Sequence, residues 1–343
     1  MTILKALCIV NLDETSRKEL MVRGPLYQAE SKPLFSGHET FPLRYGWLKK
    51  VYDTISKNSN DPDNKHIFLK DDAIARFGVG KNMVASMRHW AMCCGVITED
   101  EPTGHLIPTA FGDFLFGPRG NDPYLENLAS IWHLHWYLCS CDNSRPLKTT
   151  WFWVFNHFNE VNFKRDDLVE GLMKLAKARN WQRVSRTTVQ RDVECLVRMY
   201  ETRTSNNIGT VEDNLESPMA ELGLIRGIKG YFHLVRGPKP TLPNGIFTMA
   251  LDSFWNHIGT SHSISFEMIA HEPGSPGRIF LLDESDIIDR LLVLENLTQG
   301  TLRWSETAGL KQVLRDHPLG EKDRQTLLVN DYRESHHRKE AFR

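Results

Sequence analysis

Apolar residues recur at spacings of three and four along much of the chain, and this period is typical of amphipathic helices. The first such stretch begins at Phe41 and ends in the polar segment "SKNSNDPDNK". Thr40 is suited to cap its first turn, and Pro42 fits that turn because the first N–H groups of a helix have no partner within it. The apolar positions of this predicted helix fall on one face: Leu43, Trp47, Leu48 and Val51.

The segment from Leu69 to Ile97 has the layout of a helix-turn-helix. A short helical pattern over Asp71–Phe77 meets the turn sequence "GVG", and a second helix is predicted to start near Lys81. The buried face of this second helix is expected to hold Val84, Met87, Ala91 and Cys94. The opposite face carries the candidates for DNA contact: Lys81, Asn82, Ser86 and His89. For this face, DNA contact and simple solvation are equally supported.

Two short strands are predicted after this helix pair, at "GVI" and "LIPT", so the unit is expected to be winged. The tip between them, Glu99 to Glu101, is acidic. Acidic side chains repel phosphates, which argues against this wing lying on DNA.

The most aromatic part of the chain lies within residues 121–163 and is expected to form a hydrophobic core. Four side chains in it are of types that bind zinc: His133, His135, Cys139 and Cys141. Residues two apart on a helix point about 200° from each other, so neither pair faces one metal unless the helix breaks. We therefore expect core histidines and buried thiols rather than a metal site.

A second helix-turn-helix is predicted over residues 163–203, with Ser185 as the cap of its second helix. The apolar stripe of that helix holds Val189, Val193, Leu196 and Tyr200. Between Lys174 and Arg191 the chain has six Lys or Arg residues and no Asp or Glu. Such clustering favours DNA contact over a merely solvated face. The candidates for this contact are Lys174, Lys177, Arg183, Arg186, Thr187, Thr188, Arg191 and Arg198.

After a polar segment at 204–218, strands are predicted at "GYFHLV" and "GRIFLL" and a helix at "PNGIFTMALDSFWNHIG". "ESDIIDRLLVLENL" and "WSETAGLKQVLRD" then predict a third helix-turn-helix. The fold class is thus mainly α with small β-wings, in tandem winged-helix or helix-turn-helix units. The expected divisions are a loose arm 1–34, domains 35–120 and 121–203, a linker 204–218, a domain 219–318, and a charged tail 319–343.

Length, composition and charge limit the classes of protein that this chain can represent. Its 343 residues are enough for more than one hydrophobic core. No apolar run reaches the ~20 residues of a membrane-spanning helix, and the N-terminal "MTILKALCIV" lacks a cleavage site, so a cytoplasmic protein is expected. The six cysteines are then expected to be reduced. A net charge of −1 means that any DNA binding must come from local clustering.

The segment "FSGHETFPLRYGWLKK" holds the candidates for catalysis: His38, Glu39, Arg44 and Tyr45. Phosphodiester cleavage needs a base or nucleophile and positive charge, and these are suitable types. The alternative is a capping turn followed by an amphipathic helix. Pairs of acidic residues that could hold Mg²⁺ occur at 71–72, 166–167 and 283–284. Each pair is predicted at a helix start, where carboxylates favour the helix dipole without any catalytic role.

Three segments resemble a bacterial family catalogued as a domain of unknown function and found among DNA phosphorothioation defence genes. These segments are "FSGHETFPLRYGWLKK", "FGVGKNMVASMRHW", and "LHWYLCS" with "TTWFWVFN". The resemblance spans Phe35 to about Arg203, with a continuation to about Pro318. The resemblance assigns no catalytic residues in this sequence, because it does not extend to the catalytic residues of the family.

The resemblance implies a DNA-binding, strand-nicking component of an anti-phage phosphorothioation system, with Mg²⁺ as the cofactor if the protein is a nuclease. The implied partners are double-stranded DNA, a cysteine desulfurase, an ATP-pyrophosphatase-like sulfur-inserting enzyme and an ATPase. The alternative function is a non-catalytic winged-helix protein that binds DNA or recruits partners. The metal and the oligomeric state stay open.

Overall fold

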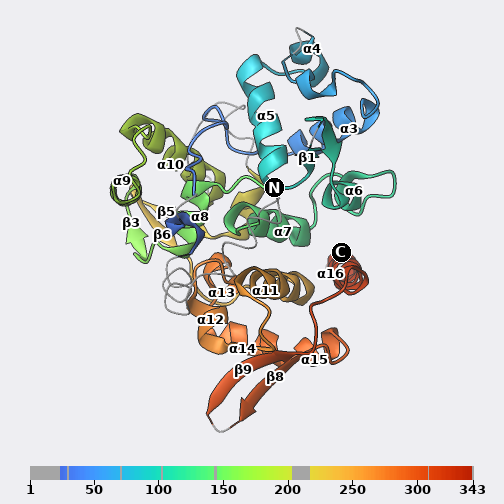
Figure 1. Ribbon diagram of the computed structural model, residues 1–343, viewed down its shortest axis with the longest axis vertical. Helices are drawn as coiled ribbons and strands as arrows, with labels where there is room; N and C mark the ends of the chain where they lie inside the picture. The colour runs from blue at the N-terminus through green and yellow to red at the C-terminus, as the bar shows by residue number, and fades with distance from the viewer. Residues whose placement is uncertain are drawn as a thin grey trace.

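In the computed structural model the described residues are 24–28, 31–69, 72–101, 103–142, 145–202, 217–307 and 309–341, with side chains described up to residue 333. Over these residues the chain is mainly helical with small sheets, as predicted. Helices α7 and α8 lie in the middle, between three groups of elements (Figure 1). None of the described helices is long and apolar enough to cross a membrane.

The first group surrounds helix α5 and contains the first predicted helix pair (Figure 1). Its elements are α3 (Trp47–Lys57), η2 (Asn64–His66), α4 (Ala73–Phe77), α5 (Lys81–Cys93), β1 (Ile97–Glu99), β2 (Leu106–Pro108) and α6 (Ala110–Phe116). Gly78 ends α4 with a φ of 61°, which a glycine adopts without a steric cost. Strands β1 and β2 pair antiparallel, so the predicted hairpin is confirmed.

Helix α3 starts at Trp47, six positions after the predicted start at Phe41. The reason lies in the turn before it, where Glu39 and Thr40 have φ values of 45° and 68°. A capping residue needs an extended backbone, so Thr40 does not cap this helix. The Phe41 N–H instead donates to the His38 carbonyl at 2.8 Å, which closes a turn.

The central helices α7 (Leu128–Cys139) and α8 (Thr149–Asn156) are almost wholly buried. The imidazole of His135 bonds the Tyr200 hydroxyl at 2.8 Å and the Ile279 carbonyl at 2.9 Å. Burial lowers the pKa of His133 to about 3 and that of His135 to about 4. Both histidines are therefore neutral core residues, as predicted.

The second group holds the basic helix pair and a four-stranded sheet. Its elements are β3 (Asn162–Phe163), α9 (Arg165–Ala178), α10 (Arg186–Tyr200), β4 (Glu201–Thr202), η3 (Pro218–Leu222), β5 (Ile225–Ile228) and β6 (Tyr231–Leu234). The strand order is β3-β6-β5-β4, with β3 leading into α9 and β4 following α10. The hairpin of β5 and β6 thus belongs to the helix pair before it, although a separate domain was predicted from residue 219. Residues 204–216 of the predicted linker lie outside the described residues.

The third group contains the C-terminal helices and a protruding hairpin (Figure 1). Its elements are α11 (Asn244–Ile258), β7 (Ser263–Ser265), α12 (Phe266–His271), α13 (Pro276–Ile279), α14 (Glu284–Leu292), α15 (Leu294–Leu297), β8 (Leu302–Thr307) and β9 (Leu310–Arg315). Two predictions are wrong here. "GRIFLL" is not a strand, because Ser275 caps a helical turn at its start. "WSETAGLKQVLRD" forms strands of the β8–β9 hairpin rather than the predicted helix.

Described parts of the expected charged tail and loose arm are helical and packed. Helix α16 (Glu321–Ala341) occupies most of the expected charged tail, and its first half packs on α7 and α11. The Asp331 carboxylate accepts the first N–H groups of α11, from Gly245 at 3.1 Å and Ile246 at 2.8 Å. In the expected loose arm, η1 (Pro25–Tyr27) is packed, with Leu26 fully buried. Residues 1–23 lie outside the described part.

Candidate nucleic-acid interface

Helix α10 is built as its sequence predicts, with one buried face and one exposed face. The Ser185 hydroxyl accepts the Thr188 N–H at 3.1 Å and caps the first turn. Its apolar stripe is fully buried and comprises Val189, Val193, Leu196 and Tyr200. Packing of this stripe orients the opposite face toward solvent.

Most of the side chains predicted to contact DNA lie on the exposed surface of α9, α10 and the loop between them. Those exposed to solvent are Lys174, Lys177, Arg183, Arg186, Thr187 and Arg191, while Thr188 and Arg198 are half-buried. We call the exposed set, with Thr188, the basic face. Arg198 lies apart from it, because its guanidinium donates to the Thr40 carbonyl at 3.5 Å.

Little of the charge on the basic face is neutralised by neighbouring acids. Arg186 pairs with Glu170 at 2.7 Å, but both side chains are about half exposed, and such surface pairs contribute little. Lys174, Lys177, Arg183 and Arg191 have no ion-pair partner within the described ranges. The face therefore presents positive charge that an external anion can neutralise.

The buried side of α10 holds a polar network that connects it to the "GHETF" turn. His38 Nε2 lies 2.6 Å from Asp192 Oδ1, and Lys148 Nζ lies 3.2 Å from the same oxygen. All three side chains are nearly or fully buried, and the His38 ring stacks on Trp90 at 6.0 Å between centroids. Asp192 Oδ2 is buried and has no hydrogen-bond partner among the described residues. The network joins residues from three separate parts of the chain.

The bonds of His38 determine which ring nitrogen carries its proton. The Thr40 N–H donates to His38 Nδ1 at 3.0 Å, so Nδ1 is an acceptor. Nε2 must then carry the proton that is donated to Asp192. Because both nitrogens are engaged and the side chain is only 2% exposed, His38 has no free nitrogen with which to accept a proton from a substrate.

The other candidates for catalysis do not gather around His38. Glu39 is exposed. The Arg44 guanidinium lies over the rings of Phe41 and Trp47, at 5.8 and 5.6 Å. The Tyr45 hydroxyl bonds the Glu221 carboxylate of η3. The turn directs the His38 ring into the core, where the side chain is buried.

The first helix pair places its candidates unequally. Lys81 and Asn82 are exposed at the start of α5, and His89 is half-buried. Burial, together with the nearby Lys148 ammonium, keeps the pKa of His89 well below its usual value. Ser86 is fully buried and its hydroxyl donates to the Phe41 carbonyl at 3.3 Å, so its predicted place on the exposed face is wrong.

Sequence reasoning missed Asp192 and Lys148. Asp192 follows Val189 by three positions and precedes Val193, so it falls on the buried side of α10. An acidic residue beside the apolar stripe of this helix could therefore have indicated a buried polar contact. Lys148 offered none, because its burial depends on contact with a residue 44 positions away.

Two of the acidic pairs considered for Mg²⁺ have structural roles, while residue 71 of the remaining pair lies outside the described residues. Asp167 accepts the Lys164 N–H at 2.7 Å, and Asp283 accepts the Asp286 N–H at 2.8 Å, as expected for carboxylates at helix starts. No three His, Cys, Asp or Glu side chains in the described part of the chain are placed to hold a metal ion. These carboxylates therefore do not fit a metal centre.

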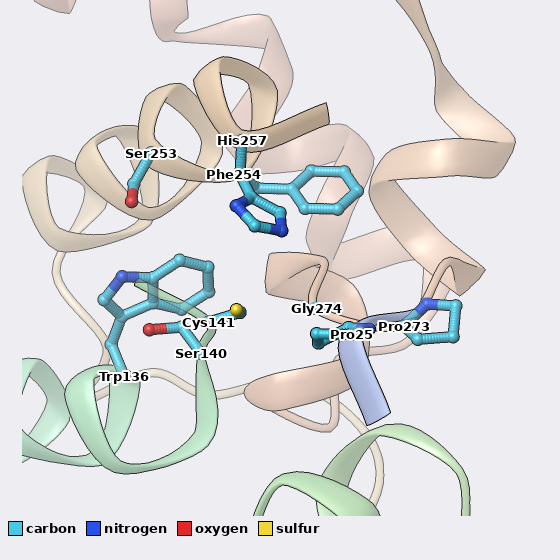
Figure 2. Close-up of a pocket in the computed structure, with 9 residues that line it drawn as sticks. All are labelled: Pro25, Trp136, Ser140, Cys141, Ser253, Phe254, His257, Pro273 and Gly274. Atoms are coloured by element: carbon cyan, nitrogen blue, oxygen red, sulfur yellow. The ribbon is translucent and has the colours of Figure 1, made fainter. Parts of the chain in front are cut away.

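A small pocket lies between the end of α7 and helix α11 (Figure 2). Its volume, about 250 Å³ with its open mouth, is below the range usual for cofactor sites. Figure 2 shows Trp136 and Cys141 facing Phe254 and His257 of α11, with Pro25 at the side. None of its lining residues belongs to the basic face, so we treat it as a packing gap between elements.

The fold and the basic face define a mainly helical protein with small sheets and one positively charged helix pair. The chain belongs to the family described as "Protein of unknown function (DUF4007)", which matches residues 35–332. This confirms the family predicted from the sequence and its start at Phe35.

Two solved structures are similar to this chain: "Magnesium ion-bound SspB crystal structure" and "SspB crystal structure". Each is 29% identical, with a TM-score of 0.77 and a match over 90% of both chains. A search of curated proteins finds no match.

Proposed function

We propose that this protein is the DNA-binding component of a bacterial DNA phosphorothioation system that defends against phage. The observation that carries the proposal is the basic face of α9 and α10, where four cationic side chains lack acidic partners among the described residues. Phosphates are the anions that such a face neutralises, with release of counterions. Similarity to SspB over most of the chain supports the assignment to this kind of system.

The topology around the basic face supports DNA rather than another anion. We propose that this unit is a winged helix, because a strand, two helices and a hairpin follow one another and the second hairpin strand pairs with the first strand. In that arrangement the second helix, here α10, enters the major groove with its N-terminal residues. Arg186, Thr187 and Arg191 lie in the first two turns of α10, where they would meet base edges and phosphates.

The test is binding of a fluorescent DNA duplex by the purified full chain, measured by anisotropy at several salt concentrations. The variant Arg183→Ala/Arg186→Ala/Arg191→Ala is expected to bind at least tenfold more weakly, with a salt slope reduced by about three. The control Lys65→Ala/Arg119→Ala/Lys311→Ala removes the same charge from exposed sites elsewhere. Equal binding by the basic-face variant and the native chain would refute the proposal.

We further propose that the bound DNA is nicked on one strand, with Glu39 and Arg44, the accessible candidates of the segment "FSGHETFPLRYGWLKK", in the roles for chemistry. Conversion of supercoiled plasmid to the open circle, with Mg²⁺ or Mn²⁺, tests this proposal. If no open circle forms at any metal concentration while binding is retained, nicking is excluded and binding stands.

A second candidate function is a non-catalytic DNA-binding regulator or recruiter. It is favoured by the engagement of both His38 nitrogens and by the carboxylate pairs that cap helices instead of facing one point. The plasmid assay separates the two functions. Co-purification with a cysteine desulfurase, a sulfur-inserting enzyme and an ATPase tests whether the chain works within a larger assembly.

A further inference from the structure

The hairpin of β5 and β6 has features that packing alone does not require. Lys229 and Gly230 at its tip have φ values of 48° and 84°, the pattern of a two-residue type I′ turn. Both are fully at the surface, and the strands next to them expose Arg226, Ile228 and Tyr231. The hairpin thus offers a narrow, projecting edge.

The exposed charges of this edge are all positive. The segment 224–240 contains four Lys or Arg residues and no Asp or Glu. Two of the four are used internally: the Lys239 ammonium bonds the Val235 carbonyl at 3.0 Å, and Arg236 bonds the Leu282 carbonyl at 3.1 Å. Arg226 and Lys229 have no ion pair within the described part of the chain. On the neighbouring strand β4, the Glu201 carboxylate lies against Gly227.

The same sheet carries an unusual share of exposed apolar surface. Ile228 is 58% exposed, Tyr231 51% and Val161 52%. A mixed edge of this kind, with large apolar side chains between cations, suits the minor groove, where apolar wedges press on base steps while Lys and Arg meet phosphates.

The hairpin is held rigidly to the basic face. Strand β3, which pairs with β6, runs directly into α9, and β4, which pairs with β5, directly follows α10. Lys164, at the start of α9, also links the helix pair to the hairpin, because its ammonium lies 4.8 Å from the centroid of the Tyr231 ring. A duplex seated on α10 would therefore meet the hairpin at a fixed position.

The other hairpin that follows a helix pair, β1–β2, has the opposite charge. Its turn holds Asp100 and Glu101 beside Glu99, and Arg88 of α5 bonds Glu99. That hairpin is unsuited to phosphates, so positive charge is not a general property of hairpins in this fold.

We propose that the β5–β6 hairpin is a second DNA contact, with Arg226 and Lys229 on the backbone and Ile228 and Tyr231 against the minor groove. This inference rests on the proposed DNA binding by the basic face. It adds a site that the spacing of sequence motifs does not reveal, because the hairpin is separated from α10 by residues 203–216.

The test uses the full chain with Arg226→Gln/Lys229→Asn. Asn is well suited to the positive φ at position 229, since Asn-Gly is the preferred type I′ turn, so the hairpin is expected to keep its fold. Binding of a duplex is expected to weaken roughly tenfold near 0.1 M salt, with a salt slope reduced by about two. Arg303→Gln/Lys311→Gln in the β8–β9 hairpin removes equal charge from another hairpin and is the control.

A second variant, Ile228→Ser/Tyr231→Ser, tests the apolar contact. It is expected to weaken binding without changing the salt slope, since it removes no charge. Native binding by both hairpin variants, with weakened binding by the basic-face variant, overturns the hairpin contact and leaves the proposed function intact. Native binding by all variants overturns both. If the hairpin variants lose a protein partner but keep full DNA affinity, the hairpin is a protein interface and the inference is wrong.

Discussion

His38 of the "GHETF" turn and Asp192 of helix α10 are 154 positions apart in sequence, yet their side chains meet at 2.6 Å. Lys148 approaches the same carboxylate oxygen from the segment before α8. The most chemically suggestive motif of the chain is therefore the anchor that holds α10 against the first helix group. The orientation of the basic face depends on this anchor.

We expect Asp192→Ala to lower the free energy of unfolding by about 3–5 kcal/mol, because it leaves the buried Lys148 ammonium without its partner. His38→Ala is expected to cost less, since it removes a neutral donor. Urea denaturation followed by circular dichroism measures both. Glu39→Ala, at the exposed neighbouring position, serves as control and is expected to change stability by less than about 0.5 kcal/mol.

Stability is expected to fall in mildly acidic solution because of the buried histidines. Burial lowers the pKa of His133 to about 3, whereas an unfolded histidine titrates near its usual value of 6.5. The unfolded chain thus binds more protons between these values, and stability present above pH ~6.5 is lost as the pH falls toward 3. Each such histidine contributes a slope of about 1.4 kcal/mol per pH unit.

Denaturation midpoints at pH 7.5, 5.5 and 4.5 measure this slope. His133 packs on Phe111 and Tyr137, and its Nδ1 has no partner in the described residues, so His133→Leu is expected to fold and to reduce the slope by one proton. An unchanged slope in this variant would show that His133 does not titrate with unfolding.

Helix α9 is expected to be sensitive to side-chain size at Gly171. A Cβ atom there would lie 2.4 Å from the Trp153 ring of α8, so Gly171→Ala must push α9 or the ring aside. We expect a loss of about 1–3 kcal/mol of stability and weaker DNA binding, because Lys174 lies one turn further along the helix. Gly80→Ala is the matched control, since a Cβ at that position meets open space.

If the protein nicks DNA with the segment "FSGHETFPLRYGWLKK", Glu39→Gln and Arg44→Gln are expected to lower the rate of open-circle formation about 100-fold or more. Binding and unfolding should not change, because Glu39 is exposed and Arg44 only rests on two rings. Full nicking by both variants, in the assay described above, would move the search for the catalytic groups elsewhere in the chain.

Much of the second helix pair could be predicted from its residues. The Ser185 cap, the apolar stripe of α10 and the exposure of Arg183 and Arg191 all follow from interactions between near neighbours in sequence. The C-terminal hairpin could not be predicted in this way. The apolar positions of "WSETAGLKQVLRD" are compatible with a helix as well as with strands. The segment forms strands because it pairs with β7, which is distant in sequence.

The sequence by itself determined the family, the mainly helical class and the cluster of positive charge on one helix pair, because these depend on local order, period and composition. Tertiary structure decided which side chains remain accessible for function. It buried His38 and Ser86, packed the expected tail on α7, and paired the β5–β6 hairpin with the strands that flank α9 and α10. Such outcomes rest on contacts between residues tens to hundreds of positions apart, whose free energies no local pattern records.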